Sequence, residues 1–454
     1  MAIQTQNPVN GEIIKKFEAH TDAQVDEAIK ASLSAHKILR NWSFEDRAKA
    51  MQKAGDILEK EAEDFGKIMT LEMGKTFKSA VAEAKKCAWV CRHYAERAEG
   101  YLADESVESG ASKSYRKYLP IGPVLAVMPW NYPFWQVMRF AAPALMAGNT
   151  GLLKHASNVP QCALAIEDIF ERAGFPNGAF KTLLISGSKV ERILRDDRVR
   201  AATLTGSEPA GASVASICGE EIKPTVLELG GSDPFIIMPS ADIQKAVSVG
   251  TTARTQNNGQ SCIAAKRFLV HADIYDDVKA KFIKAFEALK IGDPMAEETD
   301  IGPLVNKDGR DTISKQVEKA IKDGAKRVTG AEPIDGKGYY FKPGIIEDIP
   351  KSSDAYHEEI FGPVMLLYKV KNLDEAIEIA NESPFGLGSS VWTTDKAEQD
   401  KAITRIEAGA TFINSMTSSD PRLPFGGIKR SGYGRELSAE GIHAFCNVKT
   451  VSIA

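Results

Sequence analysis

Cysteine is scarce in this 454-residue chain, and its six cysteines form no Cys-x-x-Cys pair. This scarcity argues against a disulfide framework and favours a reducing compartment. Cys87 and Cys91 lie four residues apart and would share one face of a helix. Because no histidine ligands accompany them, core packing is favoured over metal binding. No metal site is therefore predicted.

Long apolar runs are also missing. No uninterrupted apolar segment approaches the roughly 20 residues that span a bilayer, and residues 1–8 lack a basic start followed by an apolar run, so we expect neither a membrane span nor a signal peptide. The formal net charge is only −4, which argues against nucleic acid as the main partner. We expect a cytoplasmic protein of two or three domains.

The order of apolar patterns predicts an α/β protein. Residues 21–103 have helical periodicity, with Thr21 as the first cap, and residues 104–118 resemble an exposed extended ribbon. From Val124 onward short apolar strands alternate with amphipathic helices, and a second alternation covers residues 234–425. Such alternation is typical of parallel sheets with helices on both faces.

A cysteine and a carboxylate carry the strongest chemical signal. Cys262 ends the polar turn Gln-Asn-Asn-Gly-Gln-Ser-Cys, and Glu228 lies in the earlier segment Leu-Glu-Leu-Gly-Gly. A thiol can act as a covalent nucleophile, and a carboxylate at a strand end can act as its base. Taken alone, a lone intracellular cysteine is more often an inert small apolar residue.

Three further positions follow predicted strands, where ligands bind in parallel sheets. Asn131 could hold an oxyanion through its amide, or could be a turn asparagine beside prolines. Lys154 could bind a ribose or a phosphate, or could be a surface lysine. The turn from Gly206 to Gly211 could bind a phosphate at a helix start, or could be an ordinary glycine-rich turn. Ala212 stands where a P-loop requires lysine, which disfavours nucleotide hydrolysis.

Taken in order along the chain, these segments resemble the aldehyde dehydrogenase superfamily over essentially the whole length. Within it, residues 135–139 and 148–156 resemble the succinate-semialdehyde dehydrogenase group. The motifs are Asn7-Pro8-Val9-Asn10-Gly11, Pro129-Trp130-Asn131, Leu227-Glu228-Leu229-Gly230-Gly231, Gly259-Gln260-Ser261-Cys262, Glu358-Glu359-Ile360-Phe361-Gly362-Pro363 and Pro424-Phe425-Gly426-Gly427.

The resemblance implies a division into three parts. A Rossmann-like cofactor domain would comprise residues 1–103 and 119–229, and an α/β catalytic domain residues 230–427. Residues 104–118 and 428–454 would form a bridging β element that adds strands to a neighbouring subunit. A homodimer or a dimer of dimers is expected.

The resemblance also implies a role for each site residue. Cys262 would attack the aldehyde to give a thiohemiacetal, with the oxyanion held by Asn131 and the Cys262 backbone N–H. After hydride transfer to the nicotinamide, Glu228 would activate the water that hydrolyses the thioester. The cofactor residues implied are Lys154 and Glu359 at the riboses, Phe361 near the nicotinamide, and Trp130, Gly206 and Ser207 at the pyrophosphate.

Two positions depart from relatives in ways that affect cofactor and redox chemistry. Ser157 stands where NAD-preferring relatives carry a glutamate that binds the ribose hydroxyls. A serine hydroxyl can donate to a 2′-phosphate, and Lys154 can supply the opposite charge, so NADP is predicted over a weaker NAD activity. Ala264 replaces a second cysteine found in some relatives, so no disulfide is expected beside Cys262.

The substrate side depends on Arg139, Trp135 and Ser419, and Gln256 departs from the family pattern there. Arg139 lies eight residues after Asn131 and would bind a substrate carboxylate, or would form a structural salt bridge. Gln256 occupies the place of a second family arginine, Trp135 would line the tunnel, and Ser419 would donate a hydrogen bond.

The leading hypothesis is NADP-linked oxidation of succinate semialdehyde to succinate. The same chemistry on glutarate semialdehyde or an aliphatic aldehyde remains an alternative. A CoA-acylating enzyme is disfavoured by Glu228, and a binding or structural protein without turnover is disfavoured by the intact Cys262, Glu228 and Asn131.

Overall fold

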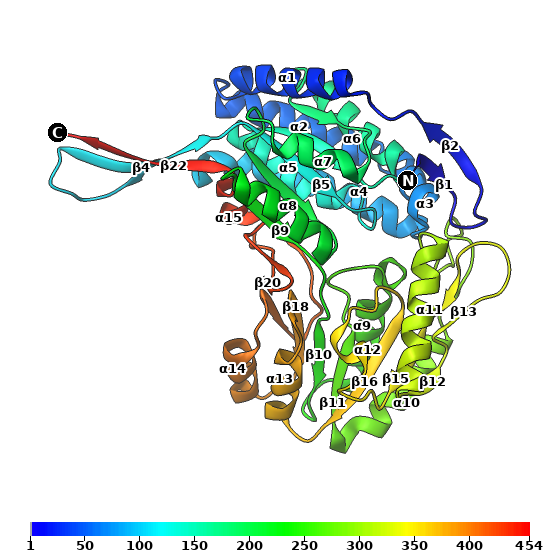
Figure 1. The fold of residues 1–454 in the computed structure, drawn as a ribbon. Helices are drawn as coiled ribbons and strands as arrows, with labels where there is room; N and C mark the ends of the chain where they lie inside the picture. The colour runs from blue at the N-terminus through cyan, green and yellow to red at the C-terminus, as the bar shows by residue number, and fades with distance from the viewer. Residues whose placement is uncertain (1) are drawn as a thin grey trace.

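Two sheets organise the chain, as the computed structural model of residues 2–454 shows (Figure 1). The first sheet has six strands, and all neighbours in it are parallel except the edge pair β21–β9. Its order is β21 (Gly432–Tyr433), β9 (Thr225–Glu228), β8 (Ala201–Thr205), β5 (Pro123–Met128), β6 (Thr150–His155) and β7 (Phe180–Thr182).

The second sheet has seven strands and lies in the other lobe (Figure 1). It is parallel except at the β12–β15 edge. Its order is β12 (Lys326–Thr329), β15 (Gly344–Glu347), β16 (Val364–Val370), β11 (Arg267–His271), β10 (Pro234–Ile237), β18 (Gly388–Trp392) and β19 (Ala410–Ile413). The helices of this lobe are α9 (Ile243–Thr255), α10 (Tyr275–Glu287), α11 (Lys307–Lys322), α12 (Asp354–His357), α13 (Leu373–Asn381) and α14 (Lys396–Arg405).

The six-stranded sheet is covered on both faces, as predicted. Along β5, Val124 and Ala126 belong to one apolar cluster, whereas Leu125 between them belongs to another. This alternation follows from the two-residue period of a strand. The first cluster contains residues of α2 (Phe44–Lys60), α3 (Ala62–Met73), α4 (Phe77–Tyr101), α5 (Trp135–Ala147) and α6 (Pro160–Ala173); the second contains residues of α1 (Asp22–Leu39), α7 (Val190–Leu194) and α8 (Glu208–Glu220).

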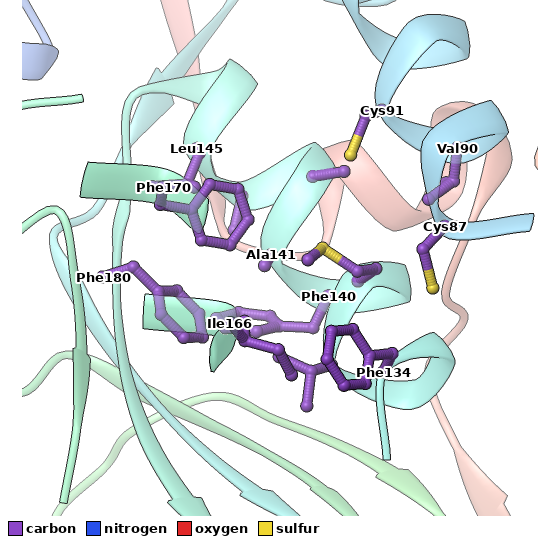
Figure 2. Close-up of a cluster of buried hydrophobic side chains, with 14 of the residues drawn as sticks. Cys87, Val90, Cys91, Phe134, Phe140, Ala141, Leu145, Ile166, Phe170 and Phe180 are labelled. Atoms are coloured by element: carbon purple, nitrogen blue, oxygen red, sulfur yellow. The ribbon is translucent and has the colours of Figure 1, made fainter. Parts of the chain in front are cut away.

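Cys87 and Cys91 both project from α4 into the first cluster, among the aromatic rings of α5 and α6 (Figure 2). Both thiols are fully buried, which agrees with their predicted role in core packing. Within residues 2–454, no cluster of three His, Cys, Asp or Glu side chains could hold a metal ion. No helix of the same residues is long and apolar enough to cross a bilayer.

The local predictions were right for helices and less exact for strands. Thr21 caps α1 through a complete capping box with Gln24. The strand expected over Thr182–Ile185 is wrong in its bounds, since β7 ends at Thr182 and buried apolar residues merely continue beyond it. Likewise β11 begins at Arg267 rather than at residue 264, because the preceding residues form a turn.

A long ribbon projects from the body, and the C-terminus lies near its tip (Figure 1). It consists of β3 (Glu105–Ser106), β4 (Lys113–Pro120) and β22 (Cys446–Ile453), with β4 and β22 paired antiparallel over their full length. Residues 428–445 do not belong to this ribbon, because β21 pairs with β9 and α15 (Ser438–His443) packs against α5.

The remaining strands form small two-stranded units outside the two large sheets. They are β1 (Ile3–Gln6) with β2 (Ile13–Phe17), β13 (Glu332–Pro333) with β14 (Phe341–Lys342), and β17 (Phe385–Gly386) with β20 (Ile428–Lys429).

Candidate active site

The turn before Cys262 is held by asparagine side chains in an uncommon backbone conformation. Asn257 and Asn258 both have left-handed φ angles, 55° and 58°. Such angles are tolerated by asparagine because its amide bonds locally to the backbone. Asn257 Nδ2 donates to the Asn131 carbonyl at 2.8 Å, and Asn258 Nδ2 donates to the Pro303 carbonyl at 2.9 Å. The turn is thus tied to distant parts of both lobes.

A buried arginine fixes the same turn from the other side. Arg254, at the end of α9, is fully buried and donates to the carbonyls of Gly259 at 2.7 Å and Gly362 at 2.6 Å. Burial lowers the pKa of Arg254 to about 9, so it stays charged at neutral pH. Gly259 has φ +76°, and a Cβ there would lie 2.4 Å from the Gly362 carbonyl carbon. Glycine is therefore required at this position.

Lys266 holds the nucleophile segment itself. Its ammonium group is fully buried and donates to the carbonyls of Ser261 and Cys262, each at 2.7 Å. The same ammonium lies 2.8 Å from Glu359 Oε1. A buried cation satisfied in this way positions the backbone on both sides of the Cys262 Cα atom.

Cys262 lies where two cavities meet. One cavity has a volume of about 540 Å³ and the other about 520 Å³, and Cys262 and Gln136 line both. Burial raises the pKa of the Cys262 thiol to about 11, although Arg139 and Lys266 act in the opposite direction. The resting sulfur is therefore a neutral thiol near pH 7 and needs a base to become nucleophilic.

Glu228 is a buried carboxyl group without hydrogen-bond partners among the described residues. It ends β9, is only 2% exposed, and neither carboxylate oxygen has a hydrogen-bond partner within residues 2–454. Burial, followed by the nearby Glu436 carboxylate, holds its pKa well above the ordinary range. A Cβ at Gly426 would lie 2.6 Å from Glu228 Oε1, so a glycine there leaves room for the carboxylate. Glu228 lies behind the cavity walls rather than on them.

Asn131 is placed close to the nucleophile turn. It follows β5, is buried, and lines the smaller cavity together with Cys262. One N–H of its amide is directed to the Gln260 carbonyl at 3.2 Å. Because an amide nitrogen carries two hydrogens, the second remains for a ligand.

The smaller cavity gathers five of the residues predicted to bind the cofactor. Ser207 precedes the 13-residue helix α8 and makes no side-chain capping bond, which leaves its hydroxyl for a ligand. Beside it, Thr205 Oγ1 is buried without a hydrogen-bond partner among the described residues. Aromatic rings of Trp130 and Phe361 stand 5.9 Å apart, edge to face. The five predicted residues on this wall are Trp130, Gly206, Ser207, Glu359 and Phe361.

Lys154 and Ser157 lie outside the wall of that cavity. Lys154 is the penultimate residue of β6, which pairs with β5 so that Val127 faces Lys154. Burial lowers the pKa of Lys154. Both residues nevertheless stand at the carboxyl end of the parallel strands, the edge at which such sheets bind ligands. Their predicted roles stay predictions.

The larger cavity gathers the three predicted substrate residues, Trp135, Arg139 and Ser419, and also contains Gln256. Arg139 Nε lies 2.7 Å from Glu436 Oε2, and both side chains are almost fully buried. Its guanidinium also lies 4.4 Å from the centre of the Phe425 ring. The structural salt bridge weighed from the sequence is therefore present, although Arg139 still borders the cavity.

Several residues on this side could not be identified from the sequence. Glu83 on α4 accepts from the backbone N–H groups of Phe134 at 2.9 Å and Trp135 at 3.0 Å, and so caps the start of α5. Its partner Lys75 is also fully buried. Lys86, one turn along α4, reaches Ser419. The only sequence signal was their spacing of three residues on one helix face, which an ordinary solvated face also shows.

Comparisons with known proteins agree with this geometry. A sequence model of the aldehyde dehydrogenase family matches residues 1–451, and the chain therefore belongs to that family. A protein of Mycobacterium tuberculosis named succinate-semialdehyde dehydrogenase [NADP(+)] 1 is 58% identical, with 100% of both chains covered. A crystal structure of succinic semialdehyde dehydrogenase from Streptococcus pyogenes with NADP+ has a TM-score of 0.98, 38% identity and 100% coverage of both chains. An aldehyde dehydrogenase from Brucella melitensis biovar abortus 2308 has a TM-score of 0.96 and 30% identity, covering 100% of this chain and 94% of its own.

Proposed function

We propose that this enzyme oxidises succinate semialdehyde to succinate, with NADP+ as the hydride acceptor. The observation that carries the proposal is the position of Cys262, whose side chain lines two cavities of similar volume. A reaction between an aldehyde and a dinucleotide needs one nucleophile that both ligands can reach. The relatives named for this reaction, at 58% identity over the whole chain, support the choice of substrate and cofactor.

The residues of the smaller cavity fit a dinucleotide. The start of α8, with the uncapped Ser207 hydroxyl and the unpartnered Thr205 hydroxyl, suits a pyrophosphate. Glu359, together with Lys154 at the strand edge outside this wall, would hold the two riboses. Trp130 would meet the pyrophosphate, and Phe361 would lie near the nicotinamide. When bound, the cofactor supplies a hydride acceptor. Ser157, in place of a carboxylate, supports a 2′-phosphate and therefore NADP over NAD.

The chain's own residues carry the acyl chemistry. Transfer of the Cys262 thiol proton to the Glu228 carboxylate, and from there to bulk water, lets Sγ bond to the aldehyde carbon, which turns the carbonyl oxygen into an oxyanion. The free N–H of Asn131 and the Cys262 backbone N–H would stabilise that oxyanion. Departure of the hydride leaves a thioester on the same sulfur.

Glu228 would then take a proton from the water that attacks the thioester carbon. The C–S bond breaks, the thiol is regenerated and succinate leaves. The raised pKa of Glu228 makes the ionised carboxylate a stronger base than an ordinary glutamate. Since its side chain lies behind the cavity walls, we propose that it rotates toward Cys262 for this step.

The projecting ribbon supports a homodimer or a dimer of dimers. Among residues 2–454, this small sheet contains the β4–β22 and β3–β4 pairings alone, so its outer edges offer unpaired backbone groups to another subunit. Sedimentation of the purified chain tests this directly, with a monomer at micromolar concentration as the contrary result.

The six free thiols are compatible with a cytoplasmic location for the enzyme.

The test of function is a panel of aldehydes. Absorbance of the reduced nicotinamide would be followed with succinate semialdehyde, glutarate semialdehyde and butanal, each with NADP and with NAD. We expect the highest kcat/KM for succinate semialdehyde with NADP and no requirement for CoA. Preference for another aldehyde would change the substrate, and dependence on CoA or silence with every aldehyde would overturn the proposal.

A further inference from the structure

We infer that Lys86 is a specificity-determining residue of the substrate cavity, and that its ammonium group binds the carboxylate at the far end of the semialdehyde. This inference rests on the proposed oxidation of succinate semialdehyde. It adds a cation from helix α4 to that proposal. Lys86 belongs to none of the sequence motifs that identify the family.

The first observation is the pairing of charges on the cavity wall. Three cations line the larger cavity: Lys78, Lys86 and Arg139. Lys78 lies 3.4 Å from Asp300, and Arg139 lies 2.7 Å from Glu436. Within residues 2–454, Lys86 has no carboxylate within ion-pair distance. Of the three, it is the cation whose charge is left for a ligand.

The second observation is the hydrogen bonding around Ser419. Its hydroxyl oxygen accepts from Lys86 Nζ at 3.0 Å and from Trp135 Nε1 at 3.0 Å. A hydroxyl has two lone pairs, and both are then used, so its own hydrogen must be donated elsewhere. Lys86 uses one of its three N–H groups for this bond, and two remain for a ligand. Lys86 and Ser419 therefore present donors side by side, the complement of a carboxylate.

The third observation is the surroundings of the ammonium group. Lys86 Nζ lies 4.4 Å from the centre of the Trp135 ring, and the residue is half-buried. Burial, with a further contribution from Arg139, lowers the pKa of Lys86 to about 8. The amine is still mostly charged at pH 7, yet it is poorly solvated, so a carboxylate would gain more from pairing here than at an exposed lysine.

This arrangement also accounts for Gln256. Gln256 lines the larger cavity at the place of a family arginine, but its neutral amide supplies no charge. The missing positive charge comes instead from another element, α4, and lies next to Trp135 and Ser419. Arg139 is left to hold Glu436 and to add to the positive potential near the bound anion.

The test compares Lys86→Met with Lys85→Met, a neighbouring exposed lysine on the same helix. Steady-state kinetics would be measured with succinate semialdehyde and with butanal, which has the same number of carbons and no carboxylate. We expect Lys86→Met to raise KM for the semialdehyde about 10- to 100-fold, the loss of one charge-assisted pair. The change in kcat and the change with butanal should be much smaller, and Lys86→Arg should retain most of the preference.

A second measurement is independent of turnover. Succinate should protect Cys262 from alkylation in the unchanged enzyme and in Lys85→Met, but about tenfold less effectively in Lys86→Met. Equal losses with both aldehydes, or an unchanged KM for the semialdehyde, would overturn the inference. If Lys86→Met does not fold, Lys86→Gln carries the same comparison. Failure of the unchanged enzyme to oxidise the semialdehyde would instead overturn the proposed function.

Discussion

The two cavities on either side of Cys262 have nearly the same volume, about 520 and 540 Å³, but they are built from different parts of the chain. The smaller cavity, proposed to hold the cofactor, is lined mainly by residues that follow strand ends and by the start of α8. The substrate cavity is lined by side chains from the faces of helices α4, α5 and α9 and from the segment around Ser419. The first presents a helix start that suits the phosphates of any dinucleotide, whereas the second presents side chains that would select the aldehyde.

Charge separates the cavities further. The cofactor cavity is lined by three glutamates and by no lysine or arginine of the described residues, while the substrate cavity has three cations and two acids. Two of the glutamates have basic partners, Glu359 the buried Lys266 and Glu208 the exposed Arg430. Positive charge is thus presented mainly to the substrate, which is consistent with an anionic aldehyde.

The largest expected effect concerns the residue that the two cavities share. Cys262→Ala should lower kcat/KM by about a thousandfold or more, since no other group can form the acyl bond. Binding of NADP, followed by protein fluorescence, should change little, because the cofactor wall is otherwise intact. Wild-type turnover in this variant, or the absence of a protein-linked acyl group after rapid quenching, would remove the basis of the mechanism.

The next effect compares how a buried cation, Arg139, and an exposed cation, Lys78, contribute to the free energy of unfolding. Arg139→Met leaves Glu436 buried without its partner and should cost about 3 kcal/mol or more in the free energy of unfolding. Lys78→Met, whose ion pair with Asp300 is largely exposed, should cost under about 1 kcal/mol. Urea unfolding measures both. Equal losses would mean that the Arg139–Glu436 pair has no special structural role.

A smaller effect is expected at the cofactor side. Ser157→Glu would bring a carboxylate toward the 2′-phosphate and should raise KM for NADP about tenfold, while KM for NAD stays the same or falls. Steady-state kinetics with both cofactors decides this, with Ser188→Glu at an exposed position of a short 3-10 helix as the control for added charge. Equal weakening of both cofactors would contradict a role for Ser157 in the choice between them.

The smallest effect is a pH dependence on the substrate side. Lys86 binds an anion only while protonated, so KM for the semialdehyde should rise as pH passes through its pKa of about 8. Between pH 7 and pH 8 the expected rise is about twofold, from the fraction of charged amine. KM for butanal should not follow the same curve, and Lys86→Arg should abolish the rise.

The other ionisable groups around Lys86 are held in ion pairs or are buried. Arg139 on α5 is paired with Glu436, and Glu83, which lies on α4 like Lys86, is bonded to Lys75. Cys87 is a neutral thiol because burial holds its pKa well above the ordinary value, and Arg422 lowers the pKa of Asp420. A KM for the semialdehyde that is flat from pH 7 to pH 9 would contradict the part given to Lys86.

Sequence reasoning reached the family and the α/β class, and five of the seven residues that it assigned to the cofactor line one cavity, because these features depend on local order. Gly206 and Ser207 follow a strand and open a helix, and that arrangement lies within one short segment. Arg139 could be selected by its spacing from Asn131, yet its pairing with Glu436 could not, since the two residues are far apart in the chain. In the sequence, Lys86 and Glu83 have the spacing of an ordinary charged helix face. The packing of α4 against α5, which places this face on the cavity, cannot be inferred from that spacing.

By itself the sequence determined which residues can react: a thiol at 262, a carboxylate at 228 and an amide at 131, each after a strand or turn whose pattern is local. Only the tertiary structure decided which charges are neutralised and which are left for a ligand. The physical reason is that ion pairing depends on distances of a few ångströms between side chains from separate elements, and no pattern along one segment contains those distances.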